Sequence, residues 1–210
     1  MAATNTRFWD GAARKYAVQP LADPAAYERT LESTRRHLKP TDAMVEFGCG
    51  TGTTALKLAP AVARIVASDI SPEMITIAGE KAAAEGVSNV EFAVATPEAA
   101  PWPNASFDAA IAFNLLHLIE ARQAALANIH RLLKPGGLFI SKTPCLGDAN
   151  PIYRVLVPVM RMVGKAPYVA FFSNNDLERE IAAAGFEIIA RERHGSKPND
   201  SRPFLVARRT

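Results

Sequence analysis

Residues 45–55 read Val45-Glu46-Phe47-Gly48-Cys49-Gly50-Thr51-Gly52-Thr53-Thr54-Ala55, with three glycines at alternate positions between a short apolar run and helix-forming residues. This order predicts a strand, a tight turn and the start of a helix. Glycine tolerates positive φ and lets the backbone approach a ligand where a Cβ would clash. Glu46 stands at the carboxyl end of the expected strand, the edge at which open α/β sheets bind ligands. The stretch therefore predicts a nucleotide-type cofactor site.

Apolar runs and helix-forming segments alternate on both sides of this stretch. Strands are expected at 43–47, 63–68, 90–94, 107–113, 138–141, 186–190 and 203–208, helices at 23–38, from 53 to 58, 71–84, 120–133 and 176–184, and a turn at 134–137. Strands that alternate with helices predict βαβ units and a parallel sheet. The last two strands have no helix between them and should be antiparallel. We expect a Rossmann-like α/β fold with a mostly parallel seven-stranded sheet, strand 7 antiparallel, and helices on both faces.

Composition is that of a single globular domain spanning residues 1–210. The net charge of +3 comes from 24 basic and 21 acidic residues without an aromatic-interleaved basic stripe, so nucleic acid is not an expected partner. Two cysteines do not make a disulfide framework and suit a reducing compartment. The N-terminus has no apolar core of a secretory signal, and no apolar run is long enough to span a membrane. These features predict a cytoplasmic protein of unknown oligomeric state.

Two segments are expected to flank the sheet. Residues 1–20 show little periodicity but contain Phe8, Trp9 and Tyr16, which either pack on the domain or fold over the glycine turn. We assign an N-terminal lid to residues 1–38. A cap insertion is assigned to residues 147–172.

The cap contains IYRVLVPVMRMV (152–163), whose apolar residues recur at helical spacing and whose Pro158 should kink the helix. Three interpretations are open: a helix laid on the sheet, a cap over an apolar substrate or, least favoured, a peripheral membrane contact.

Two known kinds of glycine-rich phosphate-binding site are alternatives for the stretch 45–55. A Walker loop ends in Gly-Lys-Ser/Thr, whereas the first lysine after the turn is Lys57. A dinucleotide fingerprint needs Gly-x-Gly-x-x-Gly. Its third glycine falls on Thr53 in one frame and on Ala55 in the other, where the Gly/Ala variant is formally admissible. Glu46 argues against the dinucleotide site, because a carboxylate before the turn would repel a pyrophosphate.

Acidic residues at two strand ends favour a different cofactor. Glu46 suits a ligand with a positive end. Asp69, at the end of the second strand, can accept two ribose hydroxyls in bidentate fashion. A cofactor that combines a ribose and a cationic group without phosphate is S-adenosylmethionine.

The chain resembles the class I S-adenosylmethionine-dependent methyltransferases. The resemblance covers about residues 7–143 by motif and 176–208 by topology. Its motifs are, in order, Phe8-Trp9-Asp10 with Tyr16, the glycine stretch 45–55, Asp69-Ile70-Ser71, PWPNASFD (101–108) and RLLKPGG (131–137). Each motif is weak alone, and their order and spacing together are specific.

The resemblance implies roles for residues of the glycine turn. Gly48 and Gly50 would pass close under the methionine part of the cofactor, and Glu46 would lie near its ammonium group. Cys49 and Thr51 would line the turn through backbone contacts.

The other expected cofactor contacts come from neighbouring strand ends. Asp69 would hold the ribose hydroxyls, and Ile70 and Met74 would flank the adenine. Asn114 would face the methionine moiety, and Tyr16 would close over it.

One position departs from the family pattern. Members usually carry an acidic residue and alanine before the fourth strand, where this chain has Thr96 and Pro97. Thr96 can accept one hydrogen bond from the adenine, but Pro97 has no N–H to donate.

Methyl transfer from a sulfonium is an in-line displacement, in which the protein mainly positions and desolvates the reactants. A base is needed only if the acceptor loses a proton. The one tentative catalytic residue is His117, three residues past Asn114, although a packing role between Leu116 and Leu118 is the alternative. His194 is expected to be solvated. No residues show metal-ligand spacing, so no metal is expected.

Aromatic and methionine residues in the cap favour an apolar or aromatic small molecule as methyl acceptor. A catalytically inactive S-adenosylmethionine-binding regulator or subunit and a nicotinamide-dependent oxidoreductase are the alternatives. The acceptor, the atom methylated and the pathway are not encoded in any recognisable motif.

Overall fold

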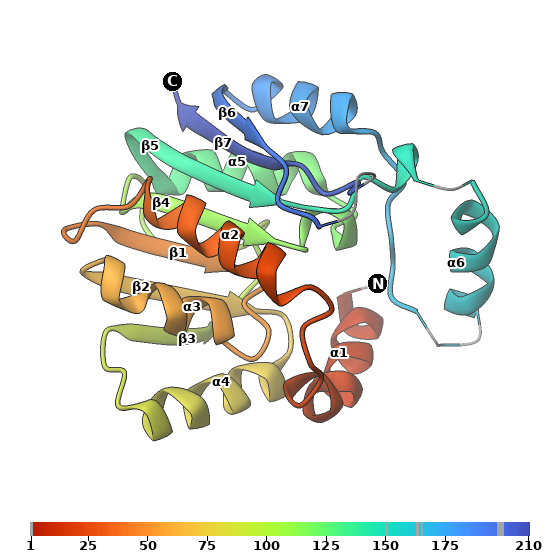
Figure 1. The fold of residues 1–210 in the computed structure, drawn as a ribbon, viewed down its shortest axis with the longest axis horizontal. Helices are drawn as coiled ribbons and strands as arrows, with labels where there is room; N and C mark the ends of the chain where they lie inside the picture. Colours follow the sequence, from red (N-terminus) through yellow and green to blue (C-terminus); the bar gives the residue numbers. More distant parts are fainter. Residues whose placement is uncertain (1, 150, 163, 165, 197–199) are drawn as a thin grey trace.

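The computed structural model describes residues 2–149, 151–162, 164, 166–196 and 200–210. Their seven strands form one sheet in the order β3-β2-β1-β4-β5-β7-β6, with β7 antiparallel to both neighbours and the others parallel where they pair within the first five (Figure 1). The strands are β1 (Ala43–Phe47), β2 (Arg64–Asp69), β3 (Val90–Val94), β4 (Phe107–Phe113), β5 (Leu133–Lys142), β6 (Phe186–Glu192) and β7 (Phe204–Arg209). The expected fold class is confirmed.

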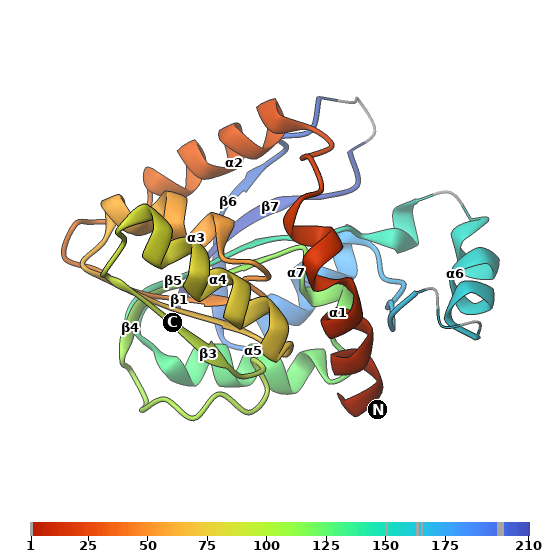
Figure 2. The same cartoon turned by 90° about the horizontal axis from the view of Figure 1, so that it is seen from below.

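Helices cover both faces of this sheet (Figure 2). They are α1 (Ala2–Ala17), α2 (Pro24–Arg35), α3 (Thr53–Leu58), α4 (Pro72–Glu85), α5 (Arg122–Leu132), α6 (Tyr153–Met162) and α7 (Asn174–Ala183), with short 3-10 turns η1 (Ala59–Ala61), η2 (Leu116–Leu118) and η3 (Leu146–Asp148). One core cluster joins the sheet to α5 and α7, and a second joins it to α2 and α3. Both faces of β1 and β4 are therefore buried, as their unbroken apolar runs predict.

Local signals set several element ends. Asp23 caps α2, with Pro24 at its first position, and Ser71 caps α4 by accepting from the Met74 N–H. Gly86 ends α4 in the left-handed conformation. These caps start α4 directly after β2, which places the α4 N-terminus at the carboxyl edge of the sheet.

Two segments differ from their expected local structure. Residues 2–17 form a regular helix, α1, which weak periodicity did not predict because much of its stability comes from packing on α4. The turn expected at 134–137 lies inside β5, where the pairing with β4 shifts register and Gly136 has a φ of 75°. Leu133 pairs with Phe107 and Leu138 with Ala109, so residues 134–137 form an irregularity within the strand.

The N-terminal lid and the cap are placed differently relative to the sheet. α1 lies at the carboxyl edge, whereas α2, which the expected lid 1–38 includes, packs on the face of the sheet through Leu31. α6 stands away from the sheet at the carboxyl edge (Figures 1 and 2), so the prediction of a helix laid on the sheet is wrong. Residues 150, 163 and 165 of the expected cap lie outside the described part of the chain. None of the helices in that part is both long and apolar enough to cross a bilayer.

Candidate functional site

The glycine turn (Gly48, Gly50 and Gly52) connects β1 to α3, and all three residues have positive φ. A Cβ on Gly48 would stand 2.8 Å from a methyl carbon of Leu115, and one on Gly52 would clash with α4. A Cβ on Gly50 would meet only the ring of Tyr16, at 3.6 Å. Packing therefore requires the outer glycines, whereas a Cβ at the middle one would make an ordinary van der Waals contact with Tyr16.

Glu46 is buried beneath this turn, with 2% of its surface exposed. It accepts a hydrogen bond from the Ala55 backbone, but its Oε2 has no hydrogen-bond partner among the described residues. Burial, reinforced by the nearby carboxylate of Asp69, raises the pKa of Glu46 to about 8. A cationic ligand group would supply the missing partner and favour the ionised form.

Asp69 is held at the end of β2 by two backbone donors. Its Oδ2 accepts from the Gly50 N–H at 3.0 Å and its Oδ1 from the Ser71 N–H at 2.9 Å. Burial raises the pKa of Asp69 in spite of these bonds. Burial also raises the pKa of Tyr16, and the carboxylates of Asp69 and Glu46 raise it further, so the phenol lies close to both. β1 and β2 are neighbours in the sheet, which is why their terminal carboxylates converge.

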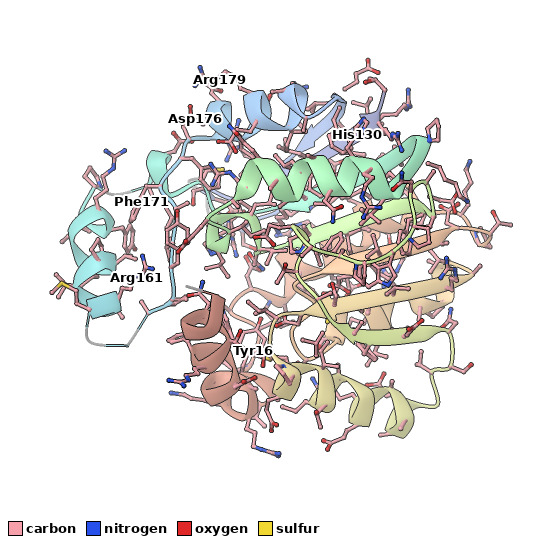
Figure 3. The ribbon with its side chains drawn as sticks, turned by 180° about the vertical axis from the view of Figure 1, so that it is seen from behind. Tyr16, His130, Arg161, Phe171, Asp176 and Arg179 are labelled. Atoms are coloured by element: carbon pink, nitrogen blue, oxygen red, sulfur yellow. The ribbon has the colours of Figure 1, made fainter. Side chains whose placement is uncertain are left out.

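α1 is fastened to the beginning of α4 by Asp10. The Asp10 Oδ1 accepts from the Ser71 hydroxyl at 2.5 Å and from the Glu73 N–H at 3.3 Å. Ala13, one turn further along, is buried against Met74. Figure 3 labels Tyr16, which this docking holds at the end of α1 beside the strand ends.

His117 lies in η2, after β4. Its Nδ1 is buried without a hydrogen-bond partner among the described residues, and burial lowers its pKa to about 4. Its carbonyl accepts from the Ala170 N–H at 2.7 Å, which ties the cap segment to the strand end. Asn114 is exposed in the left-handed conformation, with a φ of 53°. The Asn114 N–H donates to the carbonyl of Lys142 at 2.7 Å, so the ends of β4 and β5 are joined.

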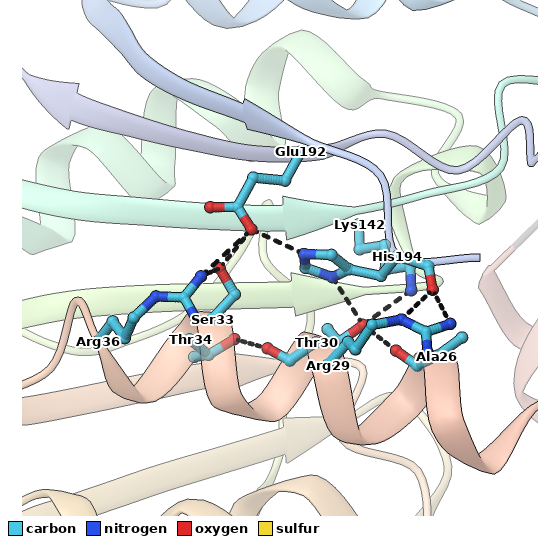
Figure 4. Close-up of polar contacts among 9 residues, drawn as sticks. All are labelled: Ala26, Arg29, Thr30, Ser33, Thr34, Arg36, Lys142, Glu192 and His194. Carbon is cyan, nitrogen blue, oxygen red and sulfur yellow. Dashed lines mark hydrogen bonds and ion pairs between the residues drawn. The ribbon is translucent and has the colours of Figure 1, made fainter. Parts of the chain in front are cut away.

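A buried polar network behind this edge joins α2 to β5 and to the segment after β6 (Figure 4). The Lys142 Nζ donates to the Thr30 hydroxyl at 2.8 Å, and that hydroxyl lies 3.0 Å from the Nδ1 of His194. The His194 Nε2 in turn lies 2.9 Å from a carboxylate oxygen of Glu192. Burial, followed by the charge of Arg202, lowers the pKa of Lys142 to about 8.

His194 is 5% exposed, so the expectation that it is solvated is wrong. Its partner Thr30 lies far away in the sequence, and no local pattern could have shown the contact. Residues 197–199 of the loop that follows it lie outside the described part of the chain.

Known proteins share this arrangement. A family profile described as a methyltransferase domain matches residues 44–137. The demethylmenaquinone methyltransferase of Thermus thermophilus is 32% identical over 166 residues, covering 69% of this chain and 74% of that protein. The chain belongs to the class I S-adenosylmethionine-dependent methyltransferases.

A further curated relative is also a methyltransferase, and a solved structure shares the fold. The uncharacterized methyltransferase YcgJ of Bacillus subtilis is 30% identical over 142 residues, covering 64% of this chain and 56% of YcgJ. This chain spans about half the length of the first curated relatives that it matches. A crystal structure of an S-adenosylmethionine-dependent methyltransferase from Mesorhizobium loti matches with a TM-score of 0.73 at 21% identity, covering 88% of this chain and 98% of that one, and shares the fold.

Class I methyltransferases use S-adenosylmethionine, and the residues at the glycine turn fit that cofactor. The unpaired Glu46 Oε2 suits a positive group, and Asp69 still has lone pairs for ribose hydroxyls after its two backbone bonds. The backbone at Gly50 is bordered by the ring of Tyr16, so a ligand that approaches this glycine closely would also contact that ring. When bound, the cofactor would supply the sulfonium from which the methyl group leaves.

Other residues predicted to contact the cofactor have mixed surroundings. Thr96 and Ile70 are half-buried, and the backbone N–H of Ala95 donates to the Asp69 carbonyl at 3.1 Å, so Thr96 lies one residue from this contact. Pro97 is buried, and its carbonyl accepts from the Asn128 side chain at 2.7 Å.

Met74 and the side chains of Thr51 and Cys49 make contacts within the protein. Met74 is 2% exposed because α1 covers it. The Thr51 hydroxyl accepts from the Lys81 Nζ at 2.9 Å. Burial raises the pKa of the Cys49 thiol well above its usual value, which keeps it protonated.

Sequence reasoning assigned no role to two residues that the structure brings to the site. Asp10 was part of the quoted Phe8-Trp9-Asp10 motif, and an acidic residue two turns before a lid aromatic was the available signal. For Lys142 the available signal was its position at the end of an apolar strand, because a charged side chain that is buried there needs a partner.

Proposed function

We propose that this chain transfers the methyl group of S-adenosylmethionine to a small, apolar or aromatic acceptor that approaches at the carboxyl ends of β4 and β5. The observation that carries the proposal is the pair of carboxyl groups, buried Glu46 and half-buried Asp69, which lie at neighbouring strand ends beside the glycine turn. A ligand with a cationic end and a ribose satisfies both groups. A pyrophosphate would satisfy neither, which disfavours the nicotinamide alternative.

Aromatic acceptors of the hydroquinone class fit this proposal best. The Thermus thermophilus relative is named a demethylmenaquinone methyltransferase, and a relative from Marinomonas, 35% identical over 101 residues, is named a ubiquinone/menaquinone biosynthesis C-methyltransferase. Methylation at a carbon of a hydroquinone ring requires loss of a proton, and His117 is neutral at pH 7 because its pKa is near 4. A pKa near 4 makes this imidazole a weak base, so its unpartnered Nδ1 takes up a proton only where the anion formed on the acceptor stabilises the imidazolium. We place His117 as the proton acceptor for acceptors of this class.

A methyl-transfer assay with labelled cofactor tests the activity. Phenols, catechols, amines and prenylated hydroquinones form the acceptor panel. We expect transfer to a hydroquinone or phenol and about a 10²-fold or larger fall in kcat for His117→Ala with unchanged affinity for S-adenosylhomocysteine. His37→Ala is the matched control, because His37 is a half-buried histidine at the end of α2 and should keep full activity.

Asp69→Asn separates binding from turnover, since it should weaken S-adenosylhomocysteine binding itself. Tight cofactor binding by the wild-type chain without transfer to any member of the panel would favour the inactive regulator or subunit. A thermal shift with NAD but none with S-adenosylhomocysteine would contradict the proposed function.

A further inference from the structure

The apolar face of α6, made of Leu156, Val159 and Met162, is exposed to solvent. The exposed fractions of these side chains are 46%, 53% and 87%. None of them belongs to a core cluster of the described residues. Large apolar side chains that gather on one exposed face generally mark an interaction surface.

The orientation of α6 shows that this face points away from the domain. The Arg161 guanidinium lies 3.5 Å from the Glu120 carboxylate and 5.1 Å from the ring centre of Tyr168. Figure 3 shows Arg161 on the side of α6 that faces the segment carrying Phe171. At 3.6 residues per turn, Val159 lies about 160° around the helix from Arg161. The side of α6 that carries Arg161 therefore contacts the rest of the domain, and the apolar side faces away from it.

The end of α1 and the residues after it lie at the same edge of the sheet as α6 (Figures 1 and 2). Val18 and Leu21, which follow α1, are apolar side chains that are half or more exposed. The exposed basic side chains of α1 are Arg7, Arg14 and Lys15. Both segments thus combine exposed apolar groups with positive charge.

The charge of the α6 segment selects one kind of partner. Residues 149–175 contain three basic residues and no acidic one. Within α6, the Glu120 carboxylate neutralises Arg161, so the positive charge of the helix comes from the exposed Arg154. An amphipathic helix with an apolar face and basic residues on its polar side binds the interface of an anionic bilayer. A second copy of this chain would bring like charges together, which disfavours self-association through the same face.

We propose that α6 and the end of α1 dock on the surface of an anionic lipid bilayer, with the apolar face of α6 inserted among the headgroups. Docking turns the carboxyl edge of the sheet, and with it the glycine turn, toward the lipid. The sequence alone favoured membrane contact least among three interpretations, because the helical segment is short and only two arginines accompany it. This docking does not depend on methyl transfer and can be measured without it.

Co-sedimentation with vesicles tests the proposal on the full-length chain. We expect binding to phosphatidylcholine vesicles that contain about 30 mol% phosphatidylglycerol, and little binding to phosphatidylcholine alone. Binding should weaken when salt rises from about 0.1 M to about 0.5 M. The double variant Val159→Asp/Met162→Asp should bind at least about tenfold more weakly, and Arg154→Glu about fivefold.

Val94→Asp is the matched control, because Val94 is a 55% exposed valine at the end of β3, far from α6 in Figure 1. It should bind vesicles as the wild type does. An unchanged unfolding midpoint would show that the double variant is folded. The proposal is overturned if the wild type stays in the supernatant with both vesicle types, or if the double variant binds like the wild type. Self-association of the wild type that the double variant abolishes, without vesicle binding, would assign the face to a second copy instead.

Discussion

At the scale of the residue, the buried carboxyl group of Glu46 lacks, among the described residues, a positive partner that would stabilise its ionised form, and a cationic ligand would supply one. Its pKa is raised to about 8, so between about pH 4.5 and pH 8 the folded chain holds a proton that the unfolded chain releases. The stability of the free protein therefore falls as pH rises through this window. The shift is caused first by burial and then by Asp69, and the resulting loss is of the order of a few kcal/mol.

We expect Glu46→Gln to flatten this pH dependence. Urea unfolding of the wild type and the variant at about pH 5.5 and pH 8 measures the difference, which isolates Glu46 from the similarly shifted Asp69. Titration of S-adenosylhomocysteine near pH 7 should also release a proton in the wild type and less in the variant, because its ammonium group favours ionised Glu46. Equal pH slopes for the two proteins would contradict this account.

At the scale of the element, α1 is held at the site by two hydrogen bonds to Asp10 as well as by apolar contacts. Asp10 accepts two hydrogen bonds from the N-terminus of α4, where an acidic side chain also interacts favourably with the helix dipole. Ser71, which donates one of them, also donates its N–H to Asp69. These hydrogen bonds therefore couple the position of α1 to Asp69, the carboxylate that is expected to bind the ribose.

Asp10→Ala should loosen α1 and weaken S-adenosylhomocysteine binding about fivefold, a loss of about 1 kcal/mol. Hydrogen exchange within α1 and calorimetry measure the two effects. Arg14→Ala is the matched control on the same helix, because the Arg14 side chain is 77% exposed and its ion pair with Glu73 contributes little. If both variants behave alike, Asp10 has no special role in holding the lid.

At the scale of the whole molecule, the Lys142–Thr30–His194–Glu192 network binds the N-terminal part of the chain to its C-terminal hairpin. Thr30 supplies the central hydroxyl, which also donates to the Ala26 carbonyl within α2. Removal of this hydroxyl takes one hydrogen-bond partner from the Lys142 ammonium and one from the His194 Nδ1 at a buried position.

Thr30→Val should lower the free energy of unfolding by about 1–3 kcal/mol, measured by urea denaturation. Thr76→Val is the matched control, because the Thr76 hydroxyl makes the same bond to a carbonyl four residues earlier but on the exposed surface of α4. Its effect should stay within about 0.5 kcal/mol. A Thr30→Val variant as stable as the control would show that the network adds no net stability.

Much of the fold could be predicted from local signals. β1, β3 and β4 begin and end where apolar runs predicted, and Ser71 and Gly86 bound α4 as expected. The candidate site was predictable to the extent that it depends on strand ends. Glu46 and Asp69 terminate neighbouring parallel strands, and the topology of βαβ units brings such ends to one edge.

The sequence by itself determined the sheet, the glycine turn and the paired carboxyl groups, because these depend on short-range patterns of burial, capping and backbone freedom. Only the tertiary structure decided that His194 is buried, that Asp10 fastens the lid and that α6 presents its apolar face outward. Each of these depends on contacts between residues far apart in the chain: His194 with Thr30, Asp10 with Ser71, and Arg161 with Glu120. Such contacts leave no periodic trace in the sequence, since the partner of each side chain is chosen by how the elements pack.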